Sequence, residues 1–517
     1  MRHSEKRTSN KDEYFNIDHL RSGLKKQALK GAGANVFSQT VSFFIQFFST
    51  MVLARLLTPA DFGLITMVTA FSLLLQSFGV TGFTEVIIQR EDINHKMMST
   101  LFWINISISF ALTLLFMAMA PILVWFYKEP QLYAITIGTA LSIIANGMAV
   151  MHMALLNRNM QFYITSGIQI AARIVPVTIA IVLAWLGWGY WALVANTVAS
   201  PLAIAVGGWI FCGWRPGLPE SGTGIKPILT FAAHTYGNFT LNYFSRNIDK
   251  LLIGWRYASQ SLGFYKKAYD LFALPANQLT APLNNVAVAT LSRLLNDPEK
   301  YRRYYLDAVS IIAFIGIPLS AMLTLAGNDI VLLILGPQWD KAGELFCYFG
   351  TSIGIMLIYS TQGWLHLSLG KPDRWFRWGV FECVITTAFF IIGLPFGASG
   401  IAIAYTVSFY VLAGPCLSYA GKPINLQLSS IIAVLWRYFF AALVAGLISF
   451  FILYSMDVTA PIFSISNVFI RIIVSSTLCL SLYLILIIAL YQGIKPISHF
   501  FSIAHQMLPG RTKITND

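Results

Sequence analysis

Charged residues are scarce in this chain. Only 11% of its 517 residues are Asp, Glu, Lys or Arg, whereas 56% are hydrophobic and the mean hydropathy is +0.66. A soluble domain carries roughly a quarter charged residues. Most of the surface must therefore face something other than water, which indicates an all-α integral membrane protein.

The sequence also lacks the patterns of metal, redox and nucleotide chemistry. Its five cysteines lie in apolar runs without CxxC spacing, so we expect no metal and no disulfide. It has no P-loop, GxSxG or HExxH, so we expect no catalytic residues, no cofactor and no ATP-driven pump. No basic run with interleaved aromatics lies outside the apolar segments, so the net charge of +13 does not indicate nucleic-acid binding.

Long apolar runs are what the sequence does contain. A membrane-spanning helix needs about 20 mostly apolar residues. We expect fourteen such helices, at 34–56, 62–88, 97–126, 131–156, 162–187, 189–212, 227–255, 262–292, 304–335, 343–369, 374–396, 398–419, 431–455 and 466–491. Two neighbouring pairs are separated only by Gly187–Gly189 and Gly397–Gly400, where a tight turn is required.

The distribution of Lys and Arg among the connecting segments predicts the orientation. With the N-terminus inside, the basic tail 1–30 and most other Lys and Arg outside the helices fall on the cytoplasmic side. The tail has no apolar core and does not resemble a signal peptide. We therefore expect a multi-pass protein with both termini in the cytoplasm and without a large external domain.

The chain repeats itself weakly. "ARLLTPADFGLI" (Ala54–Ile65) and "GWRYASQSLGFY" (Gly254–Tyr265) occupy the same helix junction at an offset of 200 residues, which relates Gly63 to Gly263. This predicts two pseudo-symmetric six-helix lobes of parallel orientation around a central cavity, plus two C-terminal helices. The expected parts are the tail 1–30, lobes 31–212 and 227–419 with the loop 213–226 between them, helices 420–491 and the tail 492–517.

Polar residues follow one face of several expected helices at steps of three and four. The seventh helix carries His234, Asn238, Asn242, then Ser245 or Arg246, then Asp249 or Lys250, and the first carries Asn35, Gln39, Ser42 and Gln46. The repeat offset relates Gln46 to Arg246, so both stripes are expected to border the space between the lobes. The substrate-binding candidates are Arg173, Arg246, Lys250, Asn35, Gln39, Gln46, Asn238 and Asn242.

Several intramembrane charges allow two interpretations. Arg246, Asp249 and Lys250 form either a self-neutralising cluster or a site with a surplus cation for an anionic group such as phosphate. Arg173, deep in the fifth helix, either bonds to a carbonyl that Pro176 leaves free or faces the cavity. Arg437 and Arg471 lie near helix ends and can extend to the interface.

Carboxylates in the apolar spans are candidates for ion coupling, because an unpaired charge in hydrocarbon is costly. These candidates are Asp249, Asp270, Glu85 and Glu382. A cation or drug antiporter would need such carboxylates without matching bases, whereas the central stripes here carry mainly cations. The cationic balance therefore favours an anionic cargo.

Three stretches resemble a known family. "RLLTPADFGLITMV" (Arg55–Val68), "ALLNRNMQF" (Ala154–Phe162) and "LGPQWDKAG" (Leu335–Gly343) are similar to signatures of bacterial polysaccharide transporters. The whole chain resembles Wzx-type lipid-linked oligosaccharide flippases of the multidrug/oligosaccharidyl-lipid/polysaccharide (MOP) superfamily, in the branch that includes the colanic-acid exporter. The motifs identify the family and not the substrate.

The resemblance implies a function in the bacterial inner membrane. A flippase of this kind carries an undecaprenyl-pyrophosphate-linked repeat unit from the cytoplasmic to the periplasmic leaflet by alternating access, for exopolysaccharide, capsule or lipopolysaccharide synthesis. Its partners would be the lipid-linked oligosaccharide, membrane lipids, and a polysaccharide polymerase with its export machinery. The alternatives are a drug or cation antiporter of the same superfamily and a membrane polysaccharide polymerase.

Overall fold

The computed structural model describes residues 24–89, 93–220, 246–455 and 467–494, together with residues 230, 236, 239, 240, 243, 244 and 498. Within these ranges the secondary structure is helical without strands, which confirms the all-α fold. The chain divides into two compact units, Met1–Gly263 and Phe264–Asp517. The predicted lobe boundaries stay predictions.

The first unit is a bundle around α6 (Leu132–Arg158), which packs on α3 (Pro59–Gln89), α4 (His95–Ala118), α5 (Ala120–Tyr127) and α8 (Tyr190–Phe211). Small side chains on α6 allow close approach. A Cβ added at Gly147 would lie 2.3 Å from the Ser109 hydroxyl of α4, and Asn105 donates to the Gly147 carbonyl at 2.8 Å. In the absence of a hydrophobic driving force inside lipid, such tight contacts and interhelical hydrogen bonds hold the bundle together.

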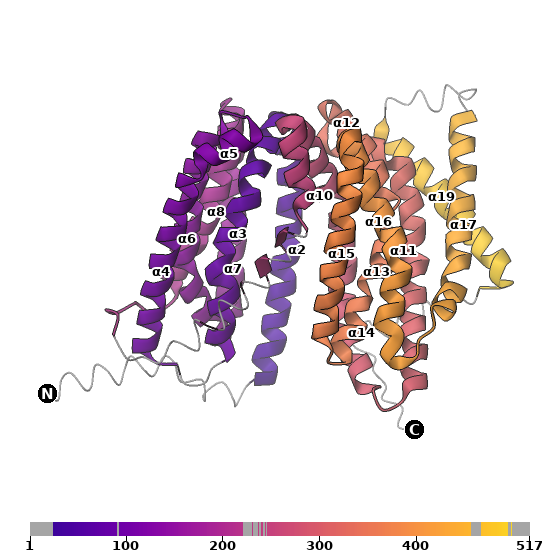
Figure 1. Cartoon of the computed structure of the whole chain (residues 1–517), viewed down its shortest axis with the longest axis horizontal. Helices are drawn as coiled ribbons and strands as arrows, with labels where there is room; N and C mark the ends of the chain where they lie inside the picture. Colours follow the sequence, from indigo (N-terminus) through magenta and orange to yellow (C-terminus); the bar gives the residue numbers. More distant parts are fainter. Residues whose placement is uncertain are drawn as a thin grey trace. The chain divides into compact units, whose positions relative to one another are not determined.

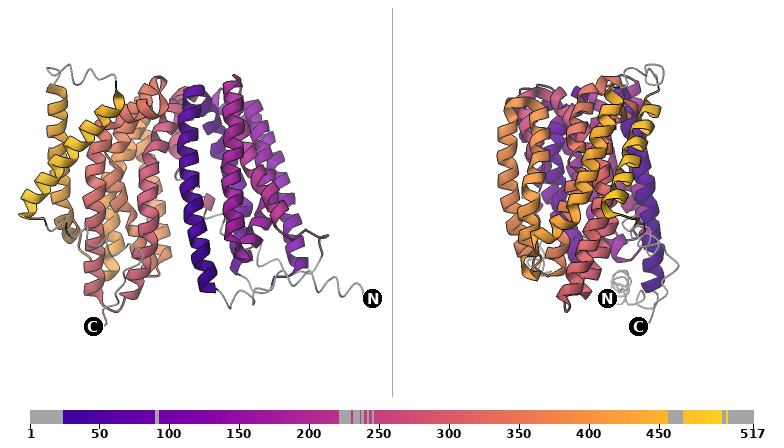
Figure 2. Two further views of the ribbon diagram at one scale, coloured as in Figure 1. Left: turned by 180° about the vertical axis from the view of Figure 1, so that it is seen from behind. Right: turned by 90° about the vertical axis from the view of Figure 1, so that its right-hand side faces the viewer.

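Two helices lie on one side of this bundle. α7 (Phe162–Trp185) packs on α8, and α2 (Leu24–Leu56) packs on α7, as the two views in Figure 1 and Figure 2 show. α7 ends and α8 begins at a turn in which Gly187 and Gly189 have positive φ values of 81° and 53°. The tight turn predicted between these spans is confirmed, since left-handed backbone favours glycine.

The second unit is built around α11 (Pro298–Leu335), which packs on α12 (Asp340–Gly350), α13 (Ile353–Ser360), α17 (Leu428–Ser455) and α19 (Val468–Tyr491). α16 (Gly397–Gly421) packs on α12, α13, α14 (Gln362–Ser368) and α15 (Pro372–Gly393). The turn between α15 and α16 passes through the short helix η4 (Leu394–Phe396) to Gly397, with φ of 78°. The second predicted glycine turn is thus also confirmed.

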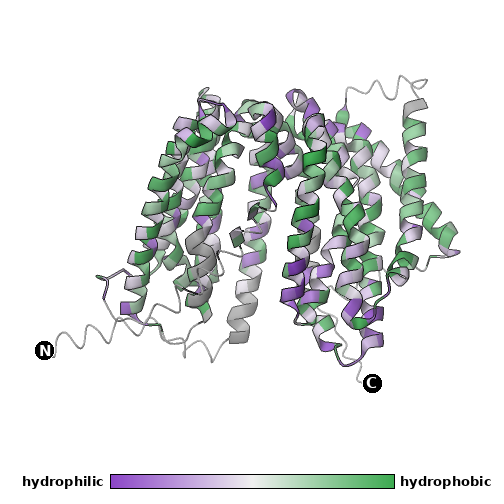
Figure 3. Cartoon of the chain, in the orientation of Figure 1, coloured by the Kyte–Doolittle hydropathy of each residue, from purple (hydrophilic) through white to green (hydrophobic). Residues whose placement is uncertain are grey.

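Apolar side chains cover the middle of the helices, while polar residues gather toward the ends (Figure 3). Among the described residues, ten helices are long and apolar enough to span a membrane, or eleven if the pair Pro337–Gly350 and Ile353–Ser368, bent by 49°, is one span. One of the ten, Pro372–Ile424, contains two predicted spans. The predicted span 227–255 lies largely outside the described residues, so the number fourteen stays a prediction.

An ion pair joins the last helix to α11. Arg471 of α19 donates to the Asp329 carboxylate of α11, 142 residues earlier in the chain. The sequence predicted only that Arg471 extends to the interface, and the structure adds its partner. Both side chains are partly exposed, at 34% and 22%, so water screens the pair only in part.

We expect Asp329→Ala to lower the free energy of unfolding by about 1 to 2 kcal/mol, because it leaves the Arg471 guanidinium without its counter-charge. Thermal unfolding in detergent measures the effect. The exchange Asp329→Arg with Arg471→Asp should recover most of it. As a control, Arg377→Ala breaks the exposed pair with Asp373 and should change little. An effect of Asp329→Ala no larger than the control would contradict the role of the pair.

Candidate functional site

α2 has two different exposed faces. Phe37, Phe44 and Phe48 are 66%, 53% and 58% exposed, as side chains that face lipid would be. Gln39 and Gln46 are exposed as well, with Asn35 and Ser42 half-buried beside them. At 100° per residue these polar positions lie roughly opposite the phenylalanines. Since amide side chains are costly in hydrocarbon, the polar face indicates a surface that meets water or a polar ligand.

The contact between α2 and α7 fixes the direction of that polar face. The Ser38 hydroxyl donates to the Ser166 carbonyl at 3.4 Å, and a Cβ at Gly31 would lie 2.2 Å from the Phe162 ring. Both contacts run in the same order along the two chains, so the helices are parallel. The stripe of α2 therefore lies beside its contact with α7.

Arg173 lies on the side of α7 that faces α2. It follows Ser166 by about two helical turns and Phe162 by about three, which returns it to the face that both residues share. The same two or three turns along α2 lead from Ser38 and Gly31 to the region of Ser42 and Gln46. Arg173 thus comes level with the polar stripe of α2.

Arg173 is exposed and has no hydrogen bond or ion pair with a described residue. Pro176 does free the carbonyl of Ala172, but the Ser200 hydroxyl of α8 donates to that carbonyl at 3.2 Å. The freed carbonyl thus has Ser200 as a donor, and no bond joins it to Arg173. The other interpretation, a cation that faces the cavity, stays a prediction.

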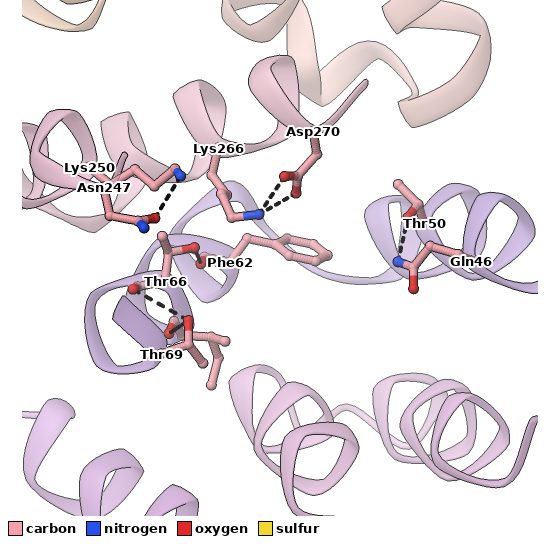
Figure 4. A network of polar contacts seen from close by, with 10 residues as sticks. Gln46, Thr50, Phe62, Thr66, Thr69, Asn247, Lys250, Lys266 and Asp270 are labelled. Carbon is pink, nitrogen blue, oxygen red and sulfur yellow. Dashed lines mark hydrogen bonds and ion pairs between the residues drawn. The ribbon is translucent and has the colours of Figure 1, made fainter. Parts of the chain in front are cut away.

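Residues 246–250 supply a second group of charges. The hydroxyls of Tyr236 and Tyr243 bond to the carbonyls of Leu74 and Thr69, at 2.9 and 3.5 Å, and so attach this part of the chain to α3. Arg246 lies in a turn and is exposed. Lys250 is 9% exposed, and its Nζ donates to Asn247 Oδ1 at 2.9 Å (Figure 4).

The three charged residues Arg246, Asp249 and Lys250 have different surroundings. Lys250 and Asp249, which is 3% exposed, are packed in the protein, whereas Arg246 is accessible. Gln46, the repeat counterpart of Arg246, donates to the Thr50 hydroxyl at 3.5 Å (Figure 4). Of the three charged residues, Arg246 is the exposed one. Asn238 and Asn242 lie outside the described residues.

The carboxylate candidates for ion coupling also differ in their surroundings. Asp270 of α10 (Ile248–Arg293) accepts from Lys266 at 2.5 and 2.6 Å, so its charge is neutralised within one helical turn (Figure 4). Glu382 of α15 is half-buried and lies within hydrogen-bonding reach of Tyr359, whose hydroxyl accepts from Trp378 at 2.8 Å. Glu85 belongs to α3, but its side chain lies outside the described residues.

No group of three or more His, Cys, Asp or Glu residues in the described part of the chain could hold a metal ion. The five cysteines form no disulfide with one another. The amides of the α2 stripe can form hydrogen bonds, and the exposed Arg173 and Arg246 can attract anions.

Solved structures with the same arrangement of helices are transporters. The chain is similar to the "Lipid II flippase MurJ, inward closed conformation", with a TM-score of 0.70, 15% identity, and coverage of 90% of this chain and 99% of that one. It is also similar to an inward-facing multidrug resistance MATE family transporter of the MOP superfamily, with a TM-score of 0.57, 14% identity, and coverage of 74% and 94%. The chain therefore shares the fold of these two structures.

Sequence comparison gives the family. Residues 52–344 match the family described as "Polysaccharide biosynthesis protein", and the chain belongs to it. It is 22% identical to "Lipopolysaccharide biosynthesis protein WzxC" of Escherichia coli K12, over 78% of this chain and 85% of that protein. It is also 22% identical to "Succinoglycan biosynthesis transport protein ExoT" of Rhizobium meliloti, over 70% and 73%. The predicted resemblance to Wzx-type proteins is confirmed.

The two exposed faces of α2 make opposite predictions for cysteine labelling. We expect Gln46→Cys to react with a hydrophilic thiol reagent at least about tenfold faster than Phe44→Cys in native membranes, because the reactive thiolate forms only where water enters. Both side chains are exposed, so exposure alone does not separate them. The five native cysteines give the background rate. Equal labelling would show that both faces of α2 meet the same medium.

Proposed function

We propose that the protein is a flippase for a prenyl-pyrophosphate-linked oligosaccharide repeat unit. The observation that carries the proposal is the accessible Arg173, level with an exposed polar stripe on a helix whose opposite face is apolar. A pyrophosphate with attached sugars cannot cross hydrocarbon unaided, since its charges and hydroxyls would lose their water. The amides and guanidinium groups replace that water, while the prenyl tail stays in lipid.

We assign the roles at the site as follows. Arg173 and Arg246 pair with phosphate oxygens, because a guanidinium presents a fork of donors that matches them. Asn35, Gln39, Gln46, Asn238 and Asn242 offer amides to sugar hydroxyls. Lys250 adds positive potential from its packed position beside Asn247. Glu382 is the candidate for ion coupling, since Asp270 already has Lys266 as partner.

Transport proceeds by alternating access between two lobes, 31–212 and 227–419, around the site. We place the protein in the bacterial inner membrane with both termini in the cytoplasm. Most Lys and Arg outside the predicted helices then fall in cytoplasmic segments, as is typical of membrane proteins. Its product is consumed by a polysaccharide polymerase and export machinery. The chemistry at the site is binding, so the protein is not an enzyme.

The rival functions fit the site less well. A drug or cation antiporter needs an accessible carboxylate, whereas Arg173, level with the stripe, and Arg246 are exposed cations. A polymerase needs catalytic groups at the outer face, usually on a large external loop, and the sequence predicts no such loop. The surplus of accessible cations favours an anionic cargo.

A deletion strain tests the function. Prenyl-linked saccharides are extracted and identified by mass spectrometry, and an impermeant sugar-modifying enzyme reports the leaflet that holds them. We expect complete repeat units trapped on the cytoplasmic side. Single units accessible from the periplasm would indicate the polymerase instead, and the absence of any accumulated prenyl-linked saccharide would favour the antiporter.

Charge reversal tests the assigned cations. Arg173→Glu and Arg246→Glu should each lower export at least about tenfold, because one charge-assisted hydrogen bond to phosphate is replaced by repulsion. Arg173→Lys should retain part of the activity, since it keeps the charge and loses the fork. Lys341→Glu, exposed in the first turn of α12, is the control and should export normally. Export by both arginine variants at normal protein level would refute their binding role.

A further inference from the structure

Arg437 on α17 is held against two aromatic rings. Its guanidinium carbon lies 5.5 Å from the ring centre of Trp436 and 4.6 Å from that of Tyr491, the last residue of α19. Stacking uses the flat faces of a guanidinium and leaves the N–H donors at its edge open. The two rings therefore orient the cation without neutralising it.

The helices around Arg437 are fixed by contacts of the next residue. Tyr438 is buried, shares a hydrogen bond of 2.8 Å with the Ser310 hydroxyl of α11, and has its ring centre 5.8 Å from that of Tyr491. α11, α17 and α19 belong to the unit Phe264–Asp517 and pack on one another. The guanidinium thus has a defined place in the fold, unlike that of a mobile surface side chain.

The described part of the chain supplies no counter-charge for this cation. Arg437 has no hydrogen bond or ion pair with a described residue, and its Nε atom is buried without a hydrogen-bond partner. Arg374 of α15 also stacks on a tyrosine, Tyr419, at 4.3 Å, but it donates to the Tyr419 carbonyl at 2.7 Å. Because a cation at the edge of hydrocarbon is costly without an anion, the open donors of Arg437 indicate a bound anion from outside the chain.

The ends of the two helices place this anion at a membrane surface. α19 ends at Tyr491, and α17 begins at Leu428, about two and a half turns before Arg437. The predicted orientation puts both of these ends on the cytoplasmic side, where Trp and Tyr mark the boundary between hydrocarbon and headgroups. Exposed apolar residues continue from Trp436 along the same face of α17 toward the membrane centre: Phe440, Leu443 and Leu447.

We propose that Arg437, Trp436 and Tyr491 form a binding site for the phosphate of an anionic phospholipid in the cytoplasmic leaflet. The edge of the guanidinium donates to phosphate oxygens, and the acyl chains follow the exposed apolar face of α17. Basic pockets between membrane helices at the cytoplasmic side bind anionic headgroups. A free phosphate would make no use of the apolar face, which favours a lipid. The proposal uses the proposed membrane orientation and does not depend on the flippase activity.

Lipid titration of the purified full-length protein tests the site. Native mass spectrometry in detergent measures the binding of phosphatidylglycerol. We expect Arg437→Gln to weaken the tightest binding step about tenfold, because it removes a charge-assisted hydrogen bond. Arg437→Lys should weaken it less, since it keeps the charge and loses the fork. Arg377→Gln is the matched control, because this exposed arginine of α15 already pairs with Asp373 at 3.2 Å. Equal binding by the wild type and Arg437→Gln would overturn the proposal.

Thermal unfolding separates a binding role from a structural one. Without added lipid, the wild type and Arg437→Gln should unfold at similar temperatures, because the substitution breaks no described hydrogen bond or ion pair. Phosphatidylglycerol should raise the unfolding temperature of the wild type more than that of the variant. Tyr491→Leu should also reduce this lipid-dependent rise, since it removes one of the stacked rings. A variant Arg437→Gln that is destabilised without lipid but shows the full lipid-dependent rise would overturn the site.

Competing ligands identify the source of the phosphate. Phosphatidylglycerol should bind more tightly than phosphatidylethanolamine, whose own ammonium group balances its phosphate, and inorganic phosphate should not displace it. Equal binding of the two lipids, or displacement by inorganic phosphate, would overturn the assignment to an anionic lipid. Preferential displacement by a prenyl pyrophosphate would assign the site to the cargo and would overturn it as well. Because none of these measurements needs transport, their failure would leave the proposed function intact, and failure of the deletion-strain test would leave this site intact.

Discussion

A charge or amide inside hydrocarbon must find a partner or water, and this constraint organises the whole structure. Asp329 and Arg471 meet across α11 and α19, and Asp270 meets Lys266 within one turn. The carbonyl that Pro176 frees receives the Ser200 hydroxyl. Against this background of satisfied groups, the accessible Arg173 stands out, and with it the exposed amides of α2.

The same constraint bears on the two exposed faces of α2. α2 packs mainly on α7, so two of its faces are open, one lined by phenylalanines and one by amides and a hydroxyl. A helix buried in the bundle, such as α6, contacts other helices on several faces and carries small residues that allow close packing. A helix with one main neighbour, such as α2, can expose a polar face on one side and an apolar face on the other.

Much of the fold could be predicted from the sequence. Apolar runs give the helices, and Gly187 and Gly397 mark turns because left-handed backbone favours glycine. The polar stripe of α2 follows from helical spacing alone. The helix bundles could be expected from the resemblance to Wzx-type proteins and agree with the solved transporters of similar fold.

Other features depend on contacts that spacing cannot reveal. The partner of Arg471 lies 142 residues away, and Glu129, the acceptor for the Ser259 hydroxyl, lies 130 residues away from it. The helix α10 is kinked at Tyr257 and Ala258, although neither position is a proline or glycine that would indicate a kink in the sequence. The spacing of Arg246, Asp249 and Lys250 places these charges close together in one predicted helix. It does not reveal that Arg246 is exposed while Asp249 and Lys250 are buried.

The central claim is that the cationic, amide-lined face moves a pyrophosphate-linked saccharide between leaflets. The direct measurement uses purified protein in liposomes that carry a prenyl-pyrophosphate-linked saccharide, with an impermeant sugar-modifying enzyme outside. The account predicts that the wild-type protein makes the inner-leaflet pool accessible and that Arg173→Glu does not. Equal accessibility with and without the wild-type protein would contradict it.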